Sequence, residues 1–222
     1  MNLSATICLS SFLFLAACSA GTRWDHGSDD QHIVRKGETL FSIAWRYGKD
    51  ADDLARWNRL GDGSLIYPGQ VLKLTPQAGT NSSGQSSASR PLPELPAQAP
   101  PAWVWPTSGG IHVEFGGKPG TGTGVLINGK AGQPVFAAAS GSVVYAGSGL
   151  IGYGQLIIIK HNDTYLSAYG YNASLLVKEG QTIKKGQQLA TMGEGPERKP
   201  RLHFEIRRNG KPVNPRQYLP AR

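Results

Sequence analysis

Cysteine is almost absent from this sequence of 222 residues. The two cysteines, Cys8 and Cys18, both lie near the start. The chain after Cys18 therefore has no thiol for a disulfide or for a metal site built on thiolates. The apolar stretch from Ile7 to Ala17 is also too short to span a bilayer as a helix.

That apolar stretch has the length of a signal peptide, which residues 1–17 are predicted to form. It ends in Leu15-Ala16-Ala17-Cys18, which resembles a bacterial lipobox, although no Lys or Arg precedes it. The resemblance implies cleavage before Cys18, lipidation of Cys18 and a tether over residues 18–31. By resemblance to the sorting rules of bacterial lipoproteins, the non-acidic Ser19 implies the periplasmic face of the outer membrane. The alternative is an ordinary secretory signal with a chance cysteine.

Acidic residues are scarce in the second half of the chain. Residues 103–222 hold 14 Lys and Arg against 6 Asp and Glu, whereas residues 1–102 are neutral overall. A basic domain favours an acidic partner, such as nucleic acid, anionic lipid or an acidic protein surface. The export signal argues against nucleic acid.

Residues 32–75 are predicted to form a compact β-α-α-β unit, with strands at 32–35 and 71–74. A first helix follows Thr39, a good N-cap, and ends at Gly48. A second helix starts at Asp50 and is expected to bury Leu54 and Trp57. The apolar residues that recur at helical spacing in the first helix are Leu40, Ile43, Ala44 and Tyr47.

This unit closely resembles a LysM domain through three motifs, which are Gly37-Glu38-Thr39-Leu40, Trp57-Asn58 and Ile66-Tyr67-Pro68-Gly69-Gln70. The resemblance implies binding of glycan that contains N-acetylglucosamine, hence peptidoglycan. The alternative is that Gly37, Thr39, Pro68 and Gly69 only shape turns and caps. The groove of the family implies these glycan-binding residues: Gly37, Glu38, Thr39, Leu40, Leu65, Ile66 and Tyr67.

Residues 76–102 lack any periodic apolar pattern and are rich in Gly, Ser and Pro, which predicts a flexible linker. Residues 103–222 lack a long helical pattern. Their short β-branched runs and the Asn209-Gly210 hairpin signal predict an all-β domain of antiparallel sheets. The predicted strands are 143–146, 156–160, 165–169, 188–191 and 202–207.

The stretch RLHFEI at residues 201–206 alternates strictly between polar and apolar side chains. Leu202, Phe204 and Ile206 are therefore expected to face the core, because alternate residues of a strand share a face. The opposite face is expected to carry Arg201, His203 and Glu205.

The second domain resembles the LytM-type, or lysostaphin-like, zinc endopeptidases over most of residues 109–219. The resemblance rests on the blocks 131–139, 141–147, 152–154, 159–161, 177–181, 202–206 and Asn214-Pro215. Residue by residue, Gly122 and Leu126 stand for the ligand His and Asp of that family. Tyr171 and Arg201 stand for two assisting histidines, and only His203, a ligand position, is retained.

Such a site lacks what zinc catalysis requires. A catalytic zinc needs three protein ligands and an open position for water, whereas one imidazole remains here. The guanidinium of Arg201 repels a dication, and Tyr171 is a poor base near neutral pH. We therefore expect no metal, no cofactor and no catalytic residue in this domain. His161 is expected to be a hydrogen-bonded structural residue.

The combination of domains resembles the NlpD/EnvC group of amidase activators. It implies a non-catalytic lipoprotein that activates a periplasmic zinc-dependent N-acetylmuramoyl-L-alanine amidase by relief of autoinhibition. The degenerate groove is then the predicted partner site, with Gly122, Leu126, Tyr169, Tyr171, Arg201 and His203.

Three alternatives remain open at this stage. The first is a weak endopeptidase that uses His203, His161 and Glu205 as ligands. The second is a purely structural wall tether. In the third, Tyr171 and Arg201 merely fill the space left by lost ligands.

Overall fold

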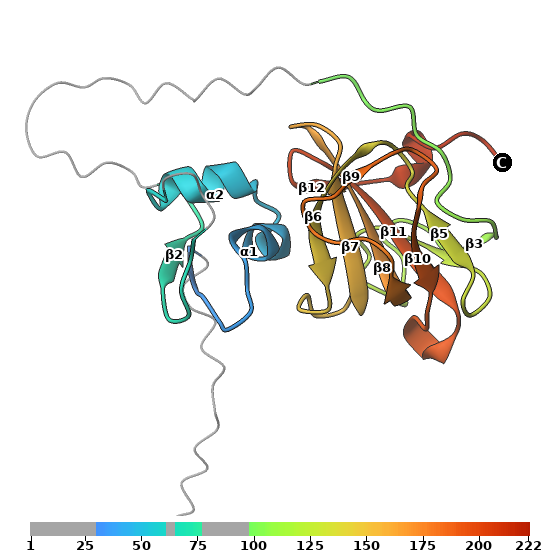
Figure 1. Ribbon diagram of the computed structural model, residues 1–222, viewed down its shortest axis with the longest axis horizontal. Helices are drawn as coiled ribbons and strands as arrows, with labels where there is room; N and C mark the ends of the chain where they lie inside the picture. The colour runs from blue at the N-terminus through green and yellow to red at the C-terminus, as the bar shows by residue number, and fades with distance from the viewer. Residues whose placement is uncertain (1–29, 61–64, 77–97) are drawn as a thin grey trace, which may run out of the picture.

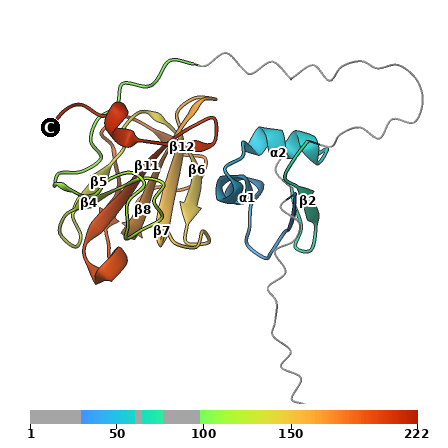
Figure 2. The same ribbon diagram turned by 180° about the vertical axis from the view of Figure 1, so that it is seen from behind.

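The computed structural model describes residues 30–60, 65–76 and 98–222. Cys18 and most of the predicted linker lie outside these ranges. Two domains lie side by side, with helix α1 of the smaller domain facing the sheet of the larger one in both views (Figures 1 and 2). Within the described ranges, no helix is both long and apolar enough to cross a bilayer.

The smaller domain has the predicted β-α-α-β order, and its caps are as expected. Thr39 forms a capping box with Ser42, and Gly48 ends the first helix in the left-handed conformation. The side chain of Asp50 accepts hydrogen bonds from the first turn of the second helix. The elements are β1 (Gln31–Ile33), α1 (Leu40–Tyr47), α2 (Ala51–Trp57) and β2 (Val71–Lys73).

One prediction about the face of α1 is wrong. Tyr47 does not enter the core but is 39% exposed, and its hydroxyl lies 3.1 Å from Nδ1 of His32. Trp57 is only partly buried. The core consists of Leu40, Ile43, Ala44, Leu54, Leu72 and Leu74 with smaller contributions from their neighbours. A second apolar side of α1, with Phe41 and Trp45, turns toward the larger domain.

The larger domain is an antiparallel sheet in which every strand pairing is antiparallel, as predicted. The main path through the sheet runs β3-β4-β11-β8-β7-β6-β9. Strand β10 pairs with β5 and β8, and β12 forms a hairpin with β11. The strands are β3 (Ile111–Val113), β4 (Val125–Asn128), β5 (Pro134–Phe136), β6 (Gly141–Gly147), β7 (Gln155–Lys160), β8 (Tyr165–Leu175), β9 (Thr182–Ile183), β10 (Gln188–Met192), β11 (Arg201–Arg208) and β12 (Lys211–Val213).

The five predicted strands and the hairpin of β11 with β12 are present, whereas β3, β4, β5 and β9 were not predicted. These four strands have two to four residues each, too few for a clear alternation. Two short 3-10 helices, η1 (Pro196–Arg198) and η2 (Pro215–Gln217), flank β11 and β12.

The larger domain begins slightly before its predicted boundary at residue 103. The backbone N–H of Gln98 donates to the hydroxyl of Thr164, and Asn162 donates to the carbonyl of Ala99. The end of the predicted linker therefore packs on the domain that follows it.

Strand β11 is buried on both faces. Leu202, Phe204 and Ile206 lie in the main core as predicted. The polar face is covered as well, since Arg201, His203, Glu205 and Arg207 are all buried. Charged groups in such a position need partners, and these partners define the candidate site.

Candidate functional site

His203 stands at the centre of the polar face of β11. In the sheet register it lies opposite Leu126 of β4 on one side and Gly170 of β8 on the other. The rings of Tyr153 and Tyr171 pack edge-on against its imidazole, with centroid distances of 5.3 and 6.0 Å. The fold thus places Leu126, Tyr171 and His203 together, as the resemblance implied, while Leu126 offers no ligand atom.

Tyr169 does not belong to this site, and that prediction is wrong. Its ring is fully buried in the main core, and its hydroxyl accepts a hydrogen bond of 2.8 Å from the N–H of Ala138. Regular alternation would put Tyr169 and Tyr171 on one face. The register between β7 and β8 shifts by one residue here, and Tyr171 has a φ of 62°. This bulge turns Tyr171 to the face of His203.

Glu205 is the hub of a buried ionic network. Its Oε1 accepts from Nε of Arg207 at 2.6 Å, and its Oε2 lies 3.2 Å from Nε2 of His203. The hydroxyl of Thr123 donates to the same Oε2 at 3.0 Å. Burial alone raises the pKa of Glu205, but Arg207 and His203 hold the pKa below its ordinary value. The carboxylate is therefore ionised at neutral pH.

His203 is covered, so the predicted groove is closed at this point. Residues 121–124, here called the cover segment, contact this face through Thr123 and Gly124 beside the imidazole, which is 1% exposed. A Cβ atom on Gly124 would stand 2.9 Å from Cε1 of His203, so only glycine fits there. Gly122, a predicted groove residue, lies in this segment with a φ of 76° and remains partly exposed.

Arg201 stands beside the cover and is 5% exposed. Its Nη2 donates to Oε2 of Glu197 at 2.9 Å. Its Nε and Nη1 are buried and have no hydrogen-bond partner among the described residues. Glu197 and Arg198 of η1 have φ values of 61° and 54°, a conformation that costs energy in residues with a side chain. Two of the guanidinium nitrogens can therefore still donate hydrogen bonds, and they lie next to the strained η1 loop.

The polar face does not fit the zinc of the active peptidases. Gly122 and Leu126 provide no donor, and the described residues contain no group of three His, Cys, Asp or Glu that could hold a metal ion. The rearranged set of His203, His161 and Glu205 is not assembled either. His161 instead bonds Ser140 and Ser167, while Glu205 pairs with Arg207.

His161 is a structural residue, as predicted. Its Nδ1 lies 2.7 Å from the carbonyl oxygen of Ser140, and its Nε2 lies 2.8 Å from the hydroxyl of Ser167. Trp103 packs edge-on against the ring. Burial lowers the pKa of His161 to about 4, so the imidazole is neutral at pH 7.

In the smaller domain, the predicted glycan residues divide into two groups. Glu38 is occupied, since its carboxylate accepts from Arg46 and from the N–H of Arg35 and lies 2.7 Å from Nε2 of His32. The side chain of Leu40 is buried in the core, which corrects its predicted contact with glycan. Ile66 is partly buried against the same core. The exposed residues are Gly37, Thr39, Leu65 and Tyr67.

Three contributions to this face were not predicted from the sequence. Arg207 and Tyr153 hold Glu205, and Trp45 reaches the same face from the other domain. The signal for Trp45 was present, because Phe41 and Trp45 are four residues apart on a short helix that is apolar on more than one side.

Comparison with known proteins agrees with both domains. Residues 32–75 match the LysM domain and residues 120–215 match peptidase family M23. The lipoprotein NlpD/LppB homolog of Pseudomonas aeruginosa is 43% identical over 230 residues, which cover 86% of this chain and 77% of that protein. The murein hydrolase activator NlpD of Salmonella typhimurium is 38% identical over 257 residues, covering 86% and 68%. Lipoprotein YgeR of Escherichia coli is 36% identical over 234 residues, covering 99% and 93%.

The fold and the site together define a LysM protein whose M23 peptidase domain has lost the ligands for zinc. At the identities and coverage just given, the chain belongs to the NlpD family of murein hydrolase activator lipoproteins.

Proposed function

We propose that this chain is a non-catalytic activator of a periplasmic N-acetylmuramoyl-L-alanine amidase in cell-wall remodelling and daughter-cell separation. The observation that carries the proposal is that the polar face has a leucine and an arginine where the active peptidases have a zinc ligand and an assisting histidine. Leu126 fills a ligand position, and Arg201 keeps two buried donors free beside the partly exposed Tyr171. Arg and Tyr are favoured at the centres of protein interfaces.

The partner is expected to meet the face formed by Gly122, Leu126, Tyr171, Arg201 and His203, without Tyr169. An acceptor from the amidase, a carboxylate or a backbone carbonyl, would bind the free donors of Arg201 in a charge-assisted hydrogen bond. Activation follows if the chain binds only the open form of the amidase, since such binding shifts the population toward that form.

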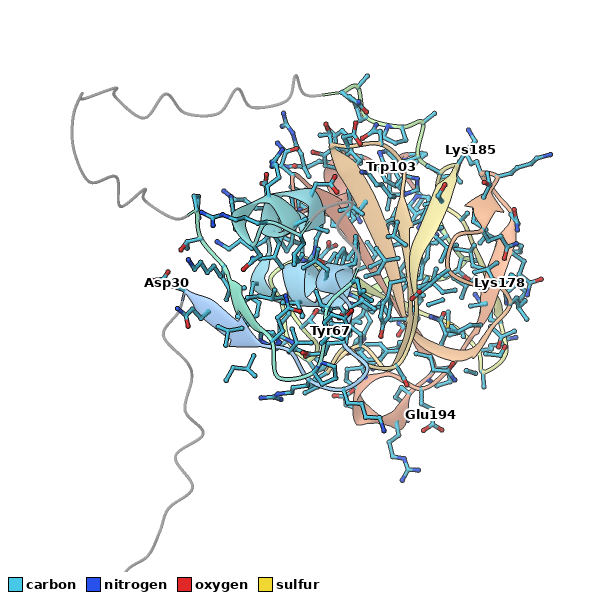
Figure 3. All side chains as sticks on the ribbon, turned by 60° about the vertical axis from the view of Figure 1, so that its left-hand side comes forward. Asp30, Tyr67, Trp103, Lys178, Lys185 and Glu194 are labelled. Carbon is cyan, nitrogen blue, oxygen red and sulfur yellow. The ribbon has the colours of Figure 1, made fainter. Side chains whose placement is uncertain are left out.

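The basic charge of the larger domain supports an acidic partner surface. Lys178 and Lys185 lie on the side of this domain away from the LysM domain (Figure 3), and both are exposed. Charges in such positions mainly increase the rate of association with an acidic surface.

The remaining parts of the proposal concern position. Tyr67 and Leu65 are the most exposed apolar residues near the glycan loops, and the LysM domain would use them to hold peptidoglycan. A lipid on Cys18 would keep the chain at the periplasmic face of the outer membrane, with residues 18–31 as the tether.

Dye release from labelled sacculi tests the proposed function. The lipid-free mature chain, a periplasmic amidase and their mixture are compared with zinc present. We expect release above the amidase background only from the mixture. Release by the chain alone would identify an enzyme, and binding to sacculi without stimulation of any periplasmic amidase would identify a structural tether.

A further inference from the structure

The LysM domain is seated on the larger domain through one side of α1. Trp45 is 3% exposed, yet it is not part of the LysM core. It packs instead into a separate apolar cluster on the outer face of the sheet, so its burial depends on the contact between the domains. This cluster consists of Tyr145, Leu150, Tyr153, Leu156, Ile158 and Ala168.

Polar contacts fix the position of α1 on this face. Nη1 of Arg207 donates to the carbonyl oxygen of Trp45 at 2.6 Å, and the guanidinium lies 3.4 Å from the centre of the Trp45 ring. At the rim, Nζ of Lys160 lies 3.0 Å from Oδ1 of Asp163 in its own domain and 3.8 Å from Oδ2 of Asp52 across the contact. The backbones also approach closely, because a Cβ on Gly210 would stand 3.0 Å from the carbonyl oxygen of Lys49.

The docked helix occupies the same face of β11 as the candidate partner site. Every second residue of β11 points to this face, namely Arg201, His203, Glu205 and Arg207. From His203 to Arg207 the strand advances by about 13 Å. A partner segment that ran along this face from Arg201 would therefore meet α1 at Arg207.

A continuous set of hydrogen bonds also joins α1 to the cover segment. Arg207 links the Trp45 carbonyl to Glu205, and Glu205 accepts from the hydroxyl of Thr123 in the cover segment. Tyr153 belongs to both regions, since it packs in the cluster with Trp45 and against the ring of His203. Removal of α1 would expose Arg207 and Tyr153, the two groups that contact Trp45.

The contact between the domains is not completely filled. A cavity of about 210 Å³ lies between them, lined by Phe41 and Ala51 on one side and by Val144 and Leu166 on the other. Lys160 and Asp52 stand at the same cavity. A contact with a partly open pocket and a charged rim is weaker than a close-packed core, so we expect the domains to separate without unfolding.

We propose that the LysM domain is an autoinhibitory latch for the partner site. Docked through Trp45, it blocks the Arg207 end of the polar face and, through Arg207 and Glu205, holds the cover segment over His203. Undocking frees the face for the protein partner. The proposal rests on the proposed function, because the partner it excludes is the amidase.

The test compares wild type with Trp45→Ala and Lys160→Asp in the lipid-free mature chain. Small-angle scattering gives the radius of gyration, and dye release gives the activator concentration for half-maximal stimulation. Both variants should increase the radius of gyration. If the docked form holds about nine tenths of the molecules, release should lower the half-maximal concentration about tenfold.

Two further variants make the comparison specific. Ile33→Ala removes an exposed apolar residue of the LysM domain and should change neither quantity. The exchange Asp52→Lys with Lys160→Asp restores opposite charges at the rim and should return both quantities toward wild type. Lys160→Asp also keeps the test valid if Trp45→Ala fails to fold.

Each outcome decides the proposal. Expansion with stronger stimulation supports the latch. Expansion with unchanged stimulation shows that docking has no regulatory effect, and an unchanged radius of gyration shows that these contacts do not hold the domains together; either result overturns it. If wild type and all variants fail to stimulate any amidase, the proposed function fails and the regulatory role with it, whereas scattering still reports the docking.

Discussion

Replacing Arg201 by alanine is expected to weaken stimulation of the amidase by about 10- to 100-fold in half-maximal activator concentration. The loss follows from a hydrogen bond between the guanidinium and an acceptor of the partner, which contributes roughly 1.5–3 kcal/mol when one group is charged. Dye release at a series of activator concentrations measures this effect.

The same variant should leave the fold almost unchanged. Nε and Nη1 of Arg201 have no hydrogen-bond partner in the described part of the chain, so their removal takes away two unsatisfied donors and leaves the exposed Glu197 in water. The free energy of unfolding, measured with urea, should therefore change by less than about 1 kcal/mol. Arg201→Lys should recover little activity, because a lysine keeps the charge but not the planar fork.

Arg198→Ala is the matched control for Arg201→Ala. Arg198 belongs to the adjacent η1 loop and its side chain is 92% exposed, so its loss should not affect stimulation. Wild-type stimulation by a folded Arg201→Ala variant would contradict the proposed partner site. It would favour the view that Arg201 only fills space beside His203.

Replacing Glu205 by alanine is expected to lower the free energy of unfolding by about 3–5 kcal/mol, the usual cost of breaking a buried ion pair. The variant leaves the buried guanidinium of Arg207 without its charged partner, and it removes the acceptor used by Thr123. Chemical denaturation followed by circular dichroism gives the free energy. Because the pKa of Glu205 is lowered in the folded chain, the loss should be largest above the ordinary glutamate pKa of 4.5 and should shrink as the pH falls below it.

Glu114→Ala provides the control for Glu205→Ala. Glu114 pairs with Arg216 at 3.6 Å, and both side chains are largely exposed. Such a pair contributes at most about 1 kcal/mol. If the two glutamate variants destabilise the chain equally, Glu205 is not the hub of the polar face, and the connection from Trp45 to the cover segment loses its support.

The sequence was sufficient for the features that depend on local spacing. Thr39, Gly48 and Asp50 cap the two helices as predicted, because capping is decided within one turn. The alternation in RLHFEI correctly placed Leu202, Phe204 and Ile206 in the core. The register of β4 and β11 then brought Leu126 beside His203, as the motif comparison implied.

The features that could not be predicted depend on contacts between distant segments. A one-residue bulge, invisible in the alternation, separates Tyr171 from Tyr169. The closed cover over His203 depends on Gly124 and Thr123, which carry no pattern of their own. The burial of Trp45 was not predicted, because the apolar residues that it packs against lie in the other domain.

The measurement that tests the central claim most directly is the zinc content of the purified mature chain, with a chelator-treated sample as the control. The claim is that this M23 fold has lost its metal chemistry and that its polar face now serves a protein partner. It predicts zinc far below one ion per chain, and the same thermal stability before and after chelation. One ion per chain, lost on chelation together with stability, would contradict the claim and restore the interpretation as a peptidase.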